Sequence, residues 1–407
     1  MNKLIERSEL RDIFEKVDAG RRISEDDCLR LFRSRDLATI AAMANLVRER
    51  KHGNVAYYIL NRHINYSNIC ILDCHFCSFY RRRRDAGAYE YSIEEMVEKA
   101  REALKLGITE IHIVGGLHPS FKWEYYIEML RTLKSLDPNL HLKAFTAIEI
   151  LHLSWVGKRS VPQVLADLRD AGLGSLTGGG AEIFDPEVRN VICHAKETAE
   201  EWLDVHRTWH NMGGRSTCTM LIGHVEKDHH RVGHMRRLRE LQDQTGGFTA
   251  FVPLAFHPEN NKLSHLEGPS GYDLLKTLAI SRIYLDNIEH IKAYWILMGM
   301  KLAQVALSYG VDDIDGTVIE EKIYHMAGAK TPQQMAREEL IRAIREAGRE
   351  PVQRDSLYQP VIVGQAAPPV HEGPETGEPP VHEGSETGEP PVPLAAYAGA
   401  TNEGGVA

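Results

Sequence analysis

The sequence predicts an α/β fold, a (β/α)8 TIM-type barrel with an N-terminal helical extension and a disordered C-terminal tail. From residue 61 to 320, short apolar runs rich in β-branched residues alternate with amphipathic helical patterns, which is typical of a parallel sheet. Eight such runs fall within about 250 residues, the usual size of this barrel. Short polar and glycine motifs follow the runs, where a barrel carries its chemistry. A partly open barrel of six units is the alternative.

The segment before the barrel, residues 1–60, is predicted to be helical. Its apolar residues recur with helical spacing in three stretches, which are Glu6–Val17, Glu25–Phe32 and Asp36–Lys51. These helices are expected to pack against the outside or base of the barrel. Residues 321–358 are expected to add a closing helical segment after it.

The barrel itself is predicted from alternating strands and helices. The expected strands are His63–Ile69, Glu110–Val114, His141–Thr146, Ser175–Thr177, Ser216–Leu221, Thr249–Pro253, His290–Ile296 and Asp312–Thr317. The expected helices between them are Ser92–Leu106, Trp123–Leu136, Pro162–Ala171, Ala199–Met212, Val232–Thr245, Tyr272–Tyr284 and Met298–Ser308. Ser92 and Glu95 have capping-box spacing, which marks the start of the first helix.

The tail, residues 359–407, differs in composition from the rest of the chain. An eleven-residue unit rich in Pro, Gly and Glu begins at Pro368 and is repeated almost verbatim from Pro379. Such a segment cannot bury enough apolar surface to offset the entropy lost on ordering. We therefore predict that it is disordered, and that a chain truncated after Tyr358 keeps nearly the same melting temperature and turnover.

Charge and composition predict a cytoplasmic enzyme without a polyanionic partner. The formal net charge is −9, but the tail carries seven of these negative charges, which leaves about −2 for the rest. This balance predicts binding neither to nucleic acid nor to an anionic membrane. The chain has no run of about 18 apolar residues and starts without an apolar signal core. Six cysteines in 407 residues are too few for a disulfide framework.

Three of the cysteines form one short motif. Cys70, Cys74 and Cys77 have the spacing C-x3-C-x2-C, and Phe76 precedes the last of them. Three thiolates so spaced can hold three irons of a 4Fe-4S cluster and leave the fourth iron free to chelate S-adenosylmethionine. A structural zinc site is the alternative, but it needs a fourth ligand, and His75 lies too close to its neighbours to serve easily. The remaining cysteines are expected to be buried; they are Cys28, Cys193 and Cys218.

Glycines and carboxylates follow the second, third and fourth predicted strands. Gly115 and Gly116 lack side chains, so the backbone there can approach the methionine end of S-adenosylmethionine. An ordinary tight turn is the alternative. The glycines at 178–180 leave room for an adenosyl group or a substrate. Glu149 and Glu182 suit ribose hydroxyls or the cofactor's ammonium group, although either could form a structural ion pair.

Histidines follow the fifth and sixth predicted strands. His224 and His257 are candidate catalytic residues, because histidine titrates near neutral pH and can transfer protons or bind a substrate carboxylate. His118 is a further candidate, whereas a lone histidine is commonly structural. His206 and His210 lie four residues apart on a predicted helix without the Glu of the H-E-x-x-H motif, which favours a packed helix face.

The cysteine motif with its preceding Phe76 resembles the radical S-adenosylmethionine superfamily. The lead-in Asn61–Cys70 is similar to the branch that makes menaquinone and deazaflavin precursors. The later runs that resemble the aminofutalosine synthase family are Gly178–Phe184, Thr219–Glu226 and Leu254–Asn260. The resemblance covers residues 20–345. Leu254 and His257 stand where the cyclising relative, cyclic dehypoxanthine futalosine synthase, is expected to carry Trp and Gln.

This resemblance implies a transferase with a 4Fe-4S cluster and S-adenosylmethionine as cofactors. It implies that the 5′-deoxyadenosyl radical adds to 3-(1-carboxyvinyloxy)benzoate, and that aryl migration and loss of bicarbonate give 6-amino-6-deoxyfutalosine for menaquinone biosynthesis. An electron donor such as flavodoxin or ferredoxin would reduce the cluster. Two alternatives remain open: a hydrogen-abstracting enzyme, either the cyclising relative or a deazaflavin (FO) synthase subunit, and a non-catalytic Fe-S or zinc scaffold protein.

Overall fold

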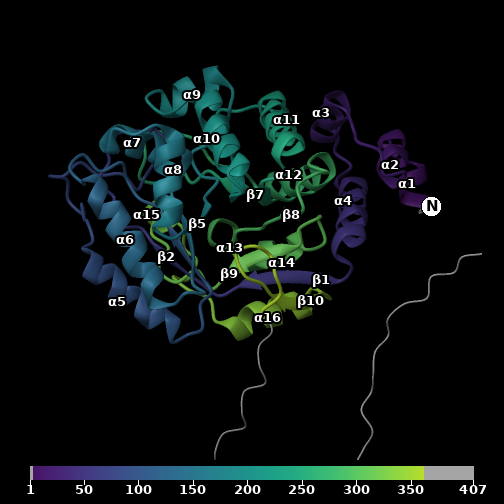
Figure 1. Ribbon diagram of the computed structural model, residues 1–407. Coiled ribbons are helices and arrows are strands. Elements are labelled where there is room, and N and C mark those ends of the chain that lie inside the picture. The colour runs from purple at the N-terminus through teal and green to yellow at the C-terminus, as the bar shows by residue number, and fades with distance from the viewer. Residues whose placement is uncertain (1–2, 362–407) are drawn as a thin grey trace, which may run out of the picture. The chain divides into compact units, whose positions relative to one another are not determined.

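Seven parallel strands form the main sheet of the computed structural model, which describes residues 3–361 (Figure 1). The strands lie in sequence order: β2 (Asn61–Ile64), β3 (Glu110–Ile113), β4 (His141–Ala144), β5 (Leu173–Leu176), β6 (Arg215–Ile222), β7 (Phe248–Ala255) and β8 (His290–Ile291). Every neighbouring pair is parallel, and helices connect the strands. The predicted α/β class with a parallel barrel sheet is confirmed.

A second sheet holds the eighth predicted strand. It consists of β1 (Val55–Ile59) in the middle, β9 (Asp313–Gly316) on one side and β10 (Glu350–Gln353) on the other. Both outer strands pair with β1 in parallel. The sequence did not predict β1 or β10, because each is short and is defined by a partner about 250 or more residues away.

The two sheets meet through single bridges. Lys292 bridges to Asp313, and Arg62 bridges to Ile319, so β9 and the residues after it lie between β8 and β2. The Ala293 N–H donates to the Asp313 carbonyl over 2.8 Å, and the His63 N–H donates to the Ile319 carbonyl over 3.0 Å. The ring of eight strands is therefore complete, but its last strand has only a few contacts to either neighbour.

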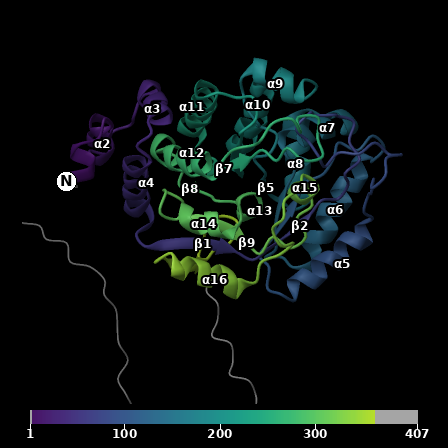
Figure 2. The same cartoon turned by 180° about the vertical axis from the view of Figure 1, so that it is seen from behind.

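The N-terminal segment is helical up to residue 52, as predicted. Its helices are α1 (Lys3–Glu6), α2 (Arg11–Asp18), α3 (Glu25–Arg33) and α4 (Leu37–His52). Ser24 and Asp27 form a capping box that starts α3. Figures 1 and 2 show α3 and α4 beside α11 and α12, and α2 packs against α4.

The later helices include all the predicted ones, together with α7 and α9, which the sequence did not predict, and a few short turns. They are α5 (Ile93–Leu104), α6 (Trp123–Leu136), α7 (Ala147–Gly157), α8 (Val161–Asp170), α9 (Pro186–Cys193), α10 (Ala199–Asn211), α11 (Asp228–Thr245), α12 (Gly271–Tyr284), α13 (Trp295–Met298), α14 (Met300–Ala306), α15 (Ile323–Met326) and α16 (Arg337–Glu346). No helix in this part of the chain is long and apolar enough to cross a membrane.

Two predicted strands were too long. The first ends at Ile64, because the following backbone leaves the sheet and bonds to the segment around Tyr89; the Asn68 N–H donates to the Tyr89 carbonyl, for example. The seventh ends at Ile291, and a helical turn begins at Trp295, whose indole N–H donates to the Gly316 carbonyl over 2.8 Å. In both places tertiary hydrogen bonds override the local β propensity.

The end of the described chain is tied to the barrel. The Tyr358 ring stacks on His290 with ring centroids 3.5 Å apart. The Gln359 carbonyl accepts from the Asp355 N–H, and the Val361 N–H donates to the Gln353 carbonyl, both over 2.8 Å. The rest of the predicted disordered tail lies outside the described residues.

A chain ending at Val361 is expected to keep the melting temperature and turnover of the full chain, whereas one ending at Tyr358 should melt lower. The second cut removes the backbone hydrogen bonds of residues 359–361, each worth about 1 kcal/mol. A barrel of this size then loses at least about 2 °C in melting temperature. Calorimetry of both truncated chains measures the difference. Equal melting temperatures would show that residues 359–361 contribute no stability.

Candidate active site

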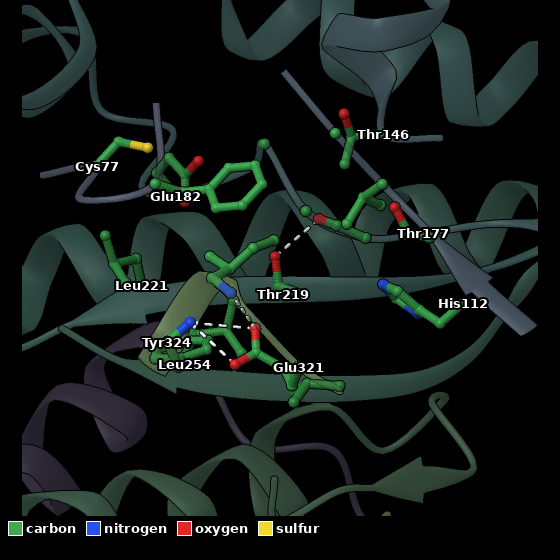
Figure 3. Close-up of a pocket in the computed structure, with 18 of the residues that line it drawn as sticks. Cys77, His112, Thr146, Thr177, Glu182, Thr219, Leu221, Leu254, Glu321 and Tyr324 are labelled. Carbon is green, nitrogen blue, oxygen red and sulfur yellow. Dashed lines mark hydrogen bonds between the residues drawn. The ribbon is translucent and has the colours of Figure 1, made fainter. Parts of the chain in front are cut away.

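A cavity of about 320 Å³ lies inside the barrel (Figure 3). Side chains from the strands and from the loops after them form its walls. The predicted site residues that line it are Cys70, Cys74, Phe76, Cys77, Gly115, Gly116, Glu149, Glu182 and His257. Residues far apart in sequence thus meet at one place, as expected for the carboxyl ends of parallel strands.

The cysteine motif occupies the loop after β2. The Sγ atom of Cys70 accepts hydrogen bonds from the backbone N–H groups of Leu72 and Leu117, each over 3.4 Å. The loop is fixed at His75, whose N–H donates to the Ile192 carbonyl over 2.7 Å. Backbone donors of this kind stabilise a thiolate, which is the form that binds metal.

The spread of the sulfurs suits a cluster better than a single zinc ion. A single metal ion needs at least three ligand atoms close together. Between residues 3 and 361, one group of three has all its donor atoms within 4.8 Å of one another, and it consists of His52, His290 and Asp312. The motif cysteines are not such a group. Tetrahedral zinc with Zn–S bonds of about 2.3 Å would hold its sulfurs about 3.8 Å apart. Cysteines that bind separate irons of a cubane lie farther apart, so the donor set fits a 4Fe-4S cluster.

The two glycines after β3 pack directly against the cysteine loop. A Cβ on Gly116 would lie 2.4 Å from the Ile69 carbonyl oxygen, and one on Gly115 would lie 2.6 Å from the Tyr66 ring. The Gly116 N–H also donates to the Ser67 carbonyl over 2.7 Å. Close packing of the loop alone therefore requires glycine at both positions.

Glu149 holds this glycine turn in place. Its carboxylate accepts from the Thr146 N–H and hydroxyl and from the Tyr66 hydroxyl, each over 2.8 Å, and from the Gly115 N–H over 3.1 Å. Glu149 is also the N3 residue of the capping box that starts α7. Burial raises the pKa of this carboxyl group despite these bonds. The side chain links three loops, and its direct contact with the cofactor stays a prediction.

Glu182 forms a buried ion pair with Lys196, which the sequence did not single out. The Lys196 ammonium lies 2.5 Å from a Glu182 oxygen and 5.7 Å from the centre of the Phe76 ring. Burial lowers the pKa of Lys196, but the carboxylates of Glu182 and Glu197 outweigh it, so the pKa rises above its usual value. Lys196 lines the cavity and is a fixed cation on the cysteine side.

Glu197 packs against Gly180, one of the three glycines after β5, and explains why this position has no side chain. Both of its carboxylate oxygens are buried without a hydrogen-bond partner, and burial raises its pKa to about 7. A Cβ on Gly180 would lie 2.8 Å from one of these oxygens. A side chain at this position would therefore strike the buried carboxylate.

The two candidate histidines differ in position. His257 lines the cavity, and its Nε2 lies 3.0 Å from the Leu297 carbonyl. His224 is buried outside the lining; its Nε2 lies 3.1 Å from the Leu221 carbonyl, and its Nδ1 lies 3.2 Å from Glu226. Glu226 also accepts the backbone N–H groups of Gly223 and His224, which folds this loop away from the cavity.

Comparison with known proteins identifies the family. A model of the radical SAM superfamily matches residues 64–238, and a model of the CofH/MqnC C-terminal region matches residues 245–366. Aminodeoxyfutalosine synthase of Thermus thermophilus is 47% identical over 86% of this chain and 95% of its own length. The chain belongs to the radical SAM superfamily. The predicted cofactors, a 4Fe-4S cluster and S-adenosylmethionine, are those of this superfamily.

Two further relatives of this radical SAM protein come from Streptomyces coelicolor. Its aminodeoxyfutalosine synthase is 44% identical over 86% of this chain and 93% of the relative. Its cyclic dehypoxanthine futalosine synthase is 36% identical over 88% of this chain and 91% of the relative. Among solved structures, the FeFe-hydrogenase maturase HydG of Carboxydothermus hydrogenoformans is 19% identical with a TM-score of 0.69, covering 86% of this chain and 80% of that one. The last similarity shows the shared fold.

Sequence reasoning also missed a polar group deep in the cavity of this radical SAM protein. His63, His112 and Lys143 lie inside β2, β3 and β4, and all three line the cavity. Lys292, just after β8, also lines it and lies 3.4 Å from Asp315. The available signal was a polar residue at an inward position of an apolar strand, as in the run His-Leu-Lys-Ala of β4.

Proposed function

We propose that this protein is an aminodeoxyfutalosine synthase, which joins the 5′-deoxyadenosyl group of S-adenosylmethionine to 3-(1-carboxyvinyloxy)benzoate and releases bicarbonate. The identity to two such synthases supports this assignment. The strongest support is a comparison within Streptomyces coelicolor. This chain is 44% identical to the aminodeoxyfutalosine synthase of that species and only 36% identical to its cyclic dehypoxanthine futalosine synthase. The product is the 6-amino-6-deoxyfutalosine that the family resemblance implies.

In this proposal Cys70, Cys74 and Cys77 hold the cluster. When bound, the cluster supplies the electron that splits S-adenosylmethionine into methionine and a 5′-deoxyadenosyl radical. The Lys196 ammonium opposes the negative charge of the Cys74 thiolate and suits the methionine carboxylate as a partner. Gly116 packs against Ile69 and Cys70, which places the glycine turn beside the cysteine loop and the proposed methionine end.

The wall opposite the cysteines suits a carbon radical. Val252, Leu254 and Phe256 line the cavity with apolar side chains, which exclude water from the reacting atoms. Radical addition requires C5′ and the vinyl carbon to be held within about 3–3.5 Å of each other. One cavity lined by both the cysteine loop and these apolar residues can hold the two ligands in contact.

We propose flavodoxin or ferredoxin as the electron donor. Arg82, Arg83 and Arg84 are exposed beside the cysteine loop, and the Arg82 guanidinium donates to the Cys70 carbonyl over 2.6 Å. Small acidic donors are attracted to such a basic surface. An acidic carrier docked there would lie next to the residues proposed to hold the cluster.

Turnover with adenosyl-labelled S-adenosylmethionine tests the proposed reaction. We expect the label to appear in aminodeoxyfutalosine, with one methionine released per product, because an added radical is not recovered. The measurement is chromatography of the reconstituted enzyme's products under anaerobic conditions, with a control lacking the benzoate substrate. If the label accumulates instead as 5′-deoxyadenosine in step with substrate consumption, the enzyme abstracts hydrogen and the cyclising reaction is the better assignment.

A further inference from the structure

We infer that His63, His112 and Lys143 form a subsite for the ring carboxylate of an aryl substrate, at the end of the cavity remote from the cysteines. This subsite is called the carboxylate row below. The inference rests on the proposed function, since it assigns one end of the substrate proposed above. It adds residues that set specificity. The sequence predicts substrate-carboxylate binding by His224 and His257 instead.

The carboxylate row is built by strand register. His63 is paired with His112, and His112 is paired with Lys143, across β2, β3 and β4. Paired residues of parallel neighbours point to the same side of the sheet and lie about 4.8 Å apart. The two imidazole rings stack with centroids 4.5 Å apart. Three polar side chains therefore stand next to one another on the inner wall of the barrel.

The carboxylate row lacks partners from the protein. Lys143 and His63 are each 8% exposed, yet in the described chain the Lys143 ammonium has no carboxylate within 4.0 Å and neither imidazole has a hydrogen bond. Buried polar groups are normally paired. Because all three side chains line the cavity, a bound anion is the partner that they can reach.

The charge and protonation of the carboxylate row suit a monoanion. Burial, with His63 and Lys143 nearby, keeps the pKa of His112 well below its usual value, so its imidazole is neutral and carries one N–H donor. Glu110 lines the same end of the cavity and accepts from the Asn61 amide over 3.3 Å. The Lys292 ammonium lines this end too but is paired with Asp315, which leaves the Lys143 ammonium, the neutral donors and the nearby Glu110 carboxylate. This balance favours a planar carboxylate over a more highly charged phosphate.

The position of the carboxylate row indicates which of the two substrate carboxylates it binds, namely the one on the ring and not the one on the vinyl group. The cysteine loop follows the end of β2, whereas the row lies within the strands. Figure 3 shows Cys77 and His112 on opposite sides of the cavity, with Thr219 between them. The vinyl group must meet the adenosyl carbon near the cysteines. The ring then extends past Leu254, and its carboxylate points toward Lys143.

The test is the Lys143→Met variant of the reconstituted enzyme, assayed with the proposed substrate and with 2-phenoxyacrylate, which lacks only the ring carboxylate. Loss of a charged hydrogen bond should raise KM for the benzoate by about 10- to 100-fold. KM for 2-phenoxyacrylate should not change, because that analogue has no group for Lys143. The ratio of the KM change for the benzoate to the KM change for 2-phenoxyacrylate measures the interaction between Lys143 and the ring carboxylate.

Controls separate folding from binding. Lys301→Met removes an exposed lysine from α14 and should leave both KM values unchanged. Iron content and melting temperature report whether Lys143→Met folds, and Lys143→Gln repeats the test with a polar side chain. If the variants keep the same ratio of KM values for the benzoate and 2-phenoxyacrylate as the unaltered enzyme, the carboxylate row does not bind the ring carboxylate.

A binding measurement distinguishes this inference from the proposed function. Calorimetry with 3-methoxybenzoate needs no turnover, and Lys143→Met should weaken its binding by about 10- to 100-fold. If the unaltered protein binds 3-methoxybenzoate through Lys143 but forms no aminodeoxyfutalosine, the subsite stands and the proposed function fails. If product forms and 3-methoxybenzoate binds equally to both proteins, the function stands and the subsite fails.

Discussion

Replacing Cys74 with alanine should remove the cluster and abolish reductive cleavage of S-adenosylmethionine. Each of the three cysteines is proposed to bind a different iron, so the loss of one leaves two protein ligands. Changes to residues that merely support metal ligands already cost about 10- to 100-fold in affinity or activity, so loss of a ligand should cost more. Iron and sulfide analysis and assay of released methionine measure the effect. Cys70→Ala and Cys77→Ala should behave alike.

Two other cysteines provide matched controls. Cys28 is fully buried in α3, away from the cavity, and Cys193 is buried at the end of α9. Cys28→Ala and Cys193→Ala should keep normal iron content and methionine release, with only a modest loss of stability. Normal iron and activity in Cys74→Ala would contradict the assignment of the motif.

Gly116→Ala is expected to have the second-largest effect, although it adds only one methyl group. The added Cβ would lie 2.4 Å from the Ile69 carbonyl oxygen and 3.1 Å from the Cys70 Cβ. Backbone atoms cannot rotate away, so the cysteine loop must shift. A displacement of about 1 Å at a reacting centre can cost about 100-fold in rate. We expect a loss of this size, together with reduced iron content.

Gly233→Ala is the matched control for this substitution. Gly233 lies in α11, and a Cβ there meets no atom within 4 Å. Alanine inside a helix is favoured over glycine by about 0.5–1 kcal/mol, so this variant should be slightly more stable and fully active. Iron content, melting temperature and methionine release compare the two variants. Full activity of Gly116→Ala would show that the loop can move without loss.

Local patterns were sufficient to predict most of the fold. Ser24 caps α3 through a capping box that lies within four residues, and the spacing that predicted α5, α6, α8, α10, α11 and α12 is also local. The helices α7 and α9 were not predicted. β1 could not be predicted in this way, because its partners Asp313 and Glu350 are distant in sequence. His290–Ile296 was predicted as one strand, since nothing in that run reveals the bond from Trp295 to Gly316.

The same distinction applies to the site. The cysteine motif and the glycine pair are each contiguous in sequence, so both could be selected as site candidates from the sequence alone. Lys143 and Lys196 are single basic residues, and only the folded chain reveals that one lacks a partner and that the other is paired with Glu182. His224 has the residue type and the place of a catalytic group, but its hydrogen bond to the Leu221 carbonyl and its contact with Glu226 hold it outside the cavity lining.

The way β9 closes the barrel has a consequence for biosynthesis. β2 and β8 stay open edges until Asp313–Ile319 has left the ribosome, because these late residues provide the bridges to both. Contacts between such distant segments slow folding, and unpaired strand edges favour aggregation in the meantime. The last step of barrel assembly therefore comes late in synthesis, and the nascent chain is a natural client for chaperones before that step.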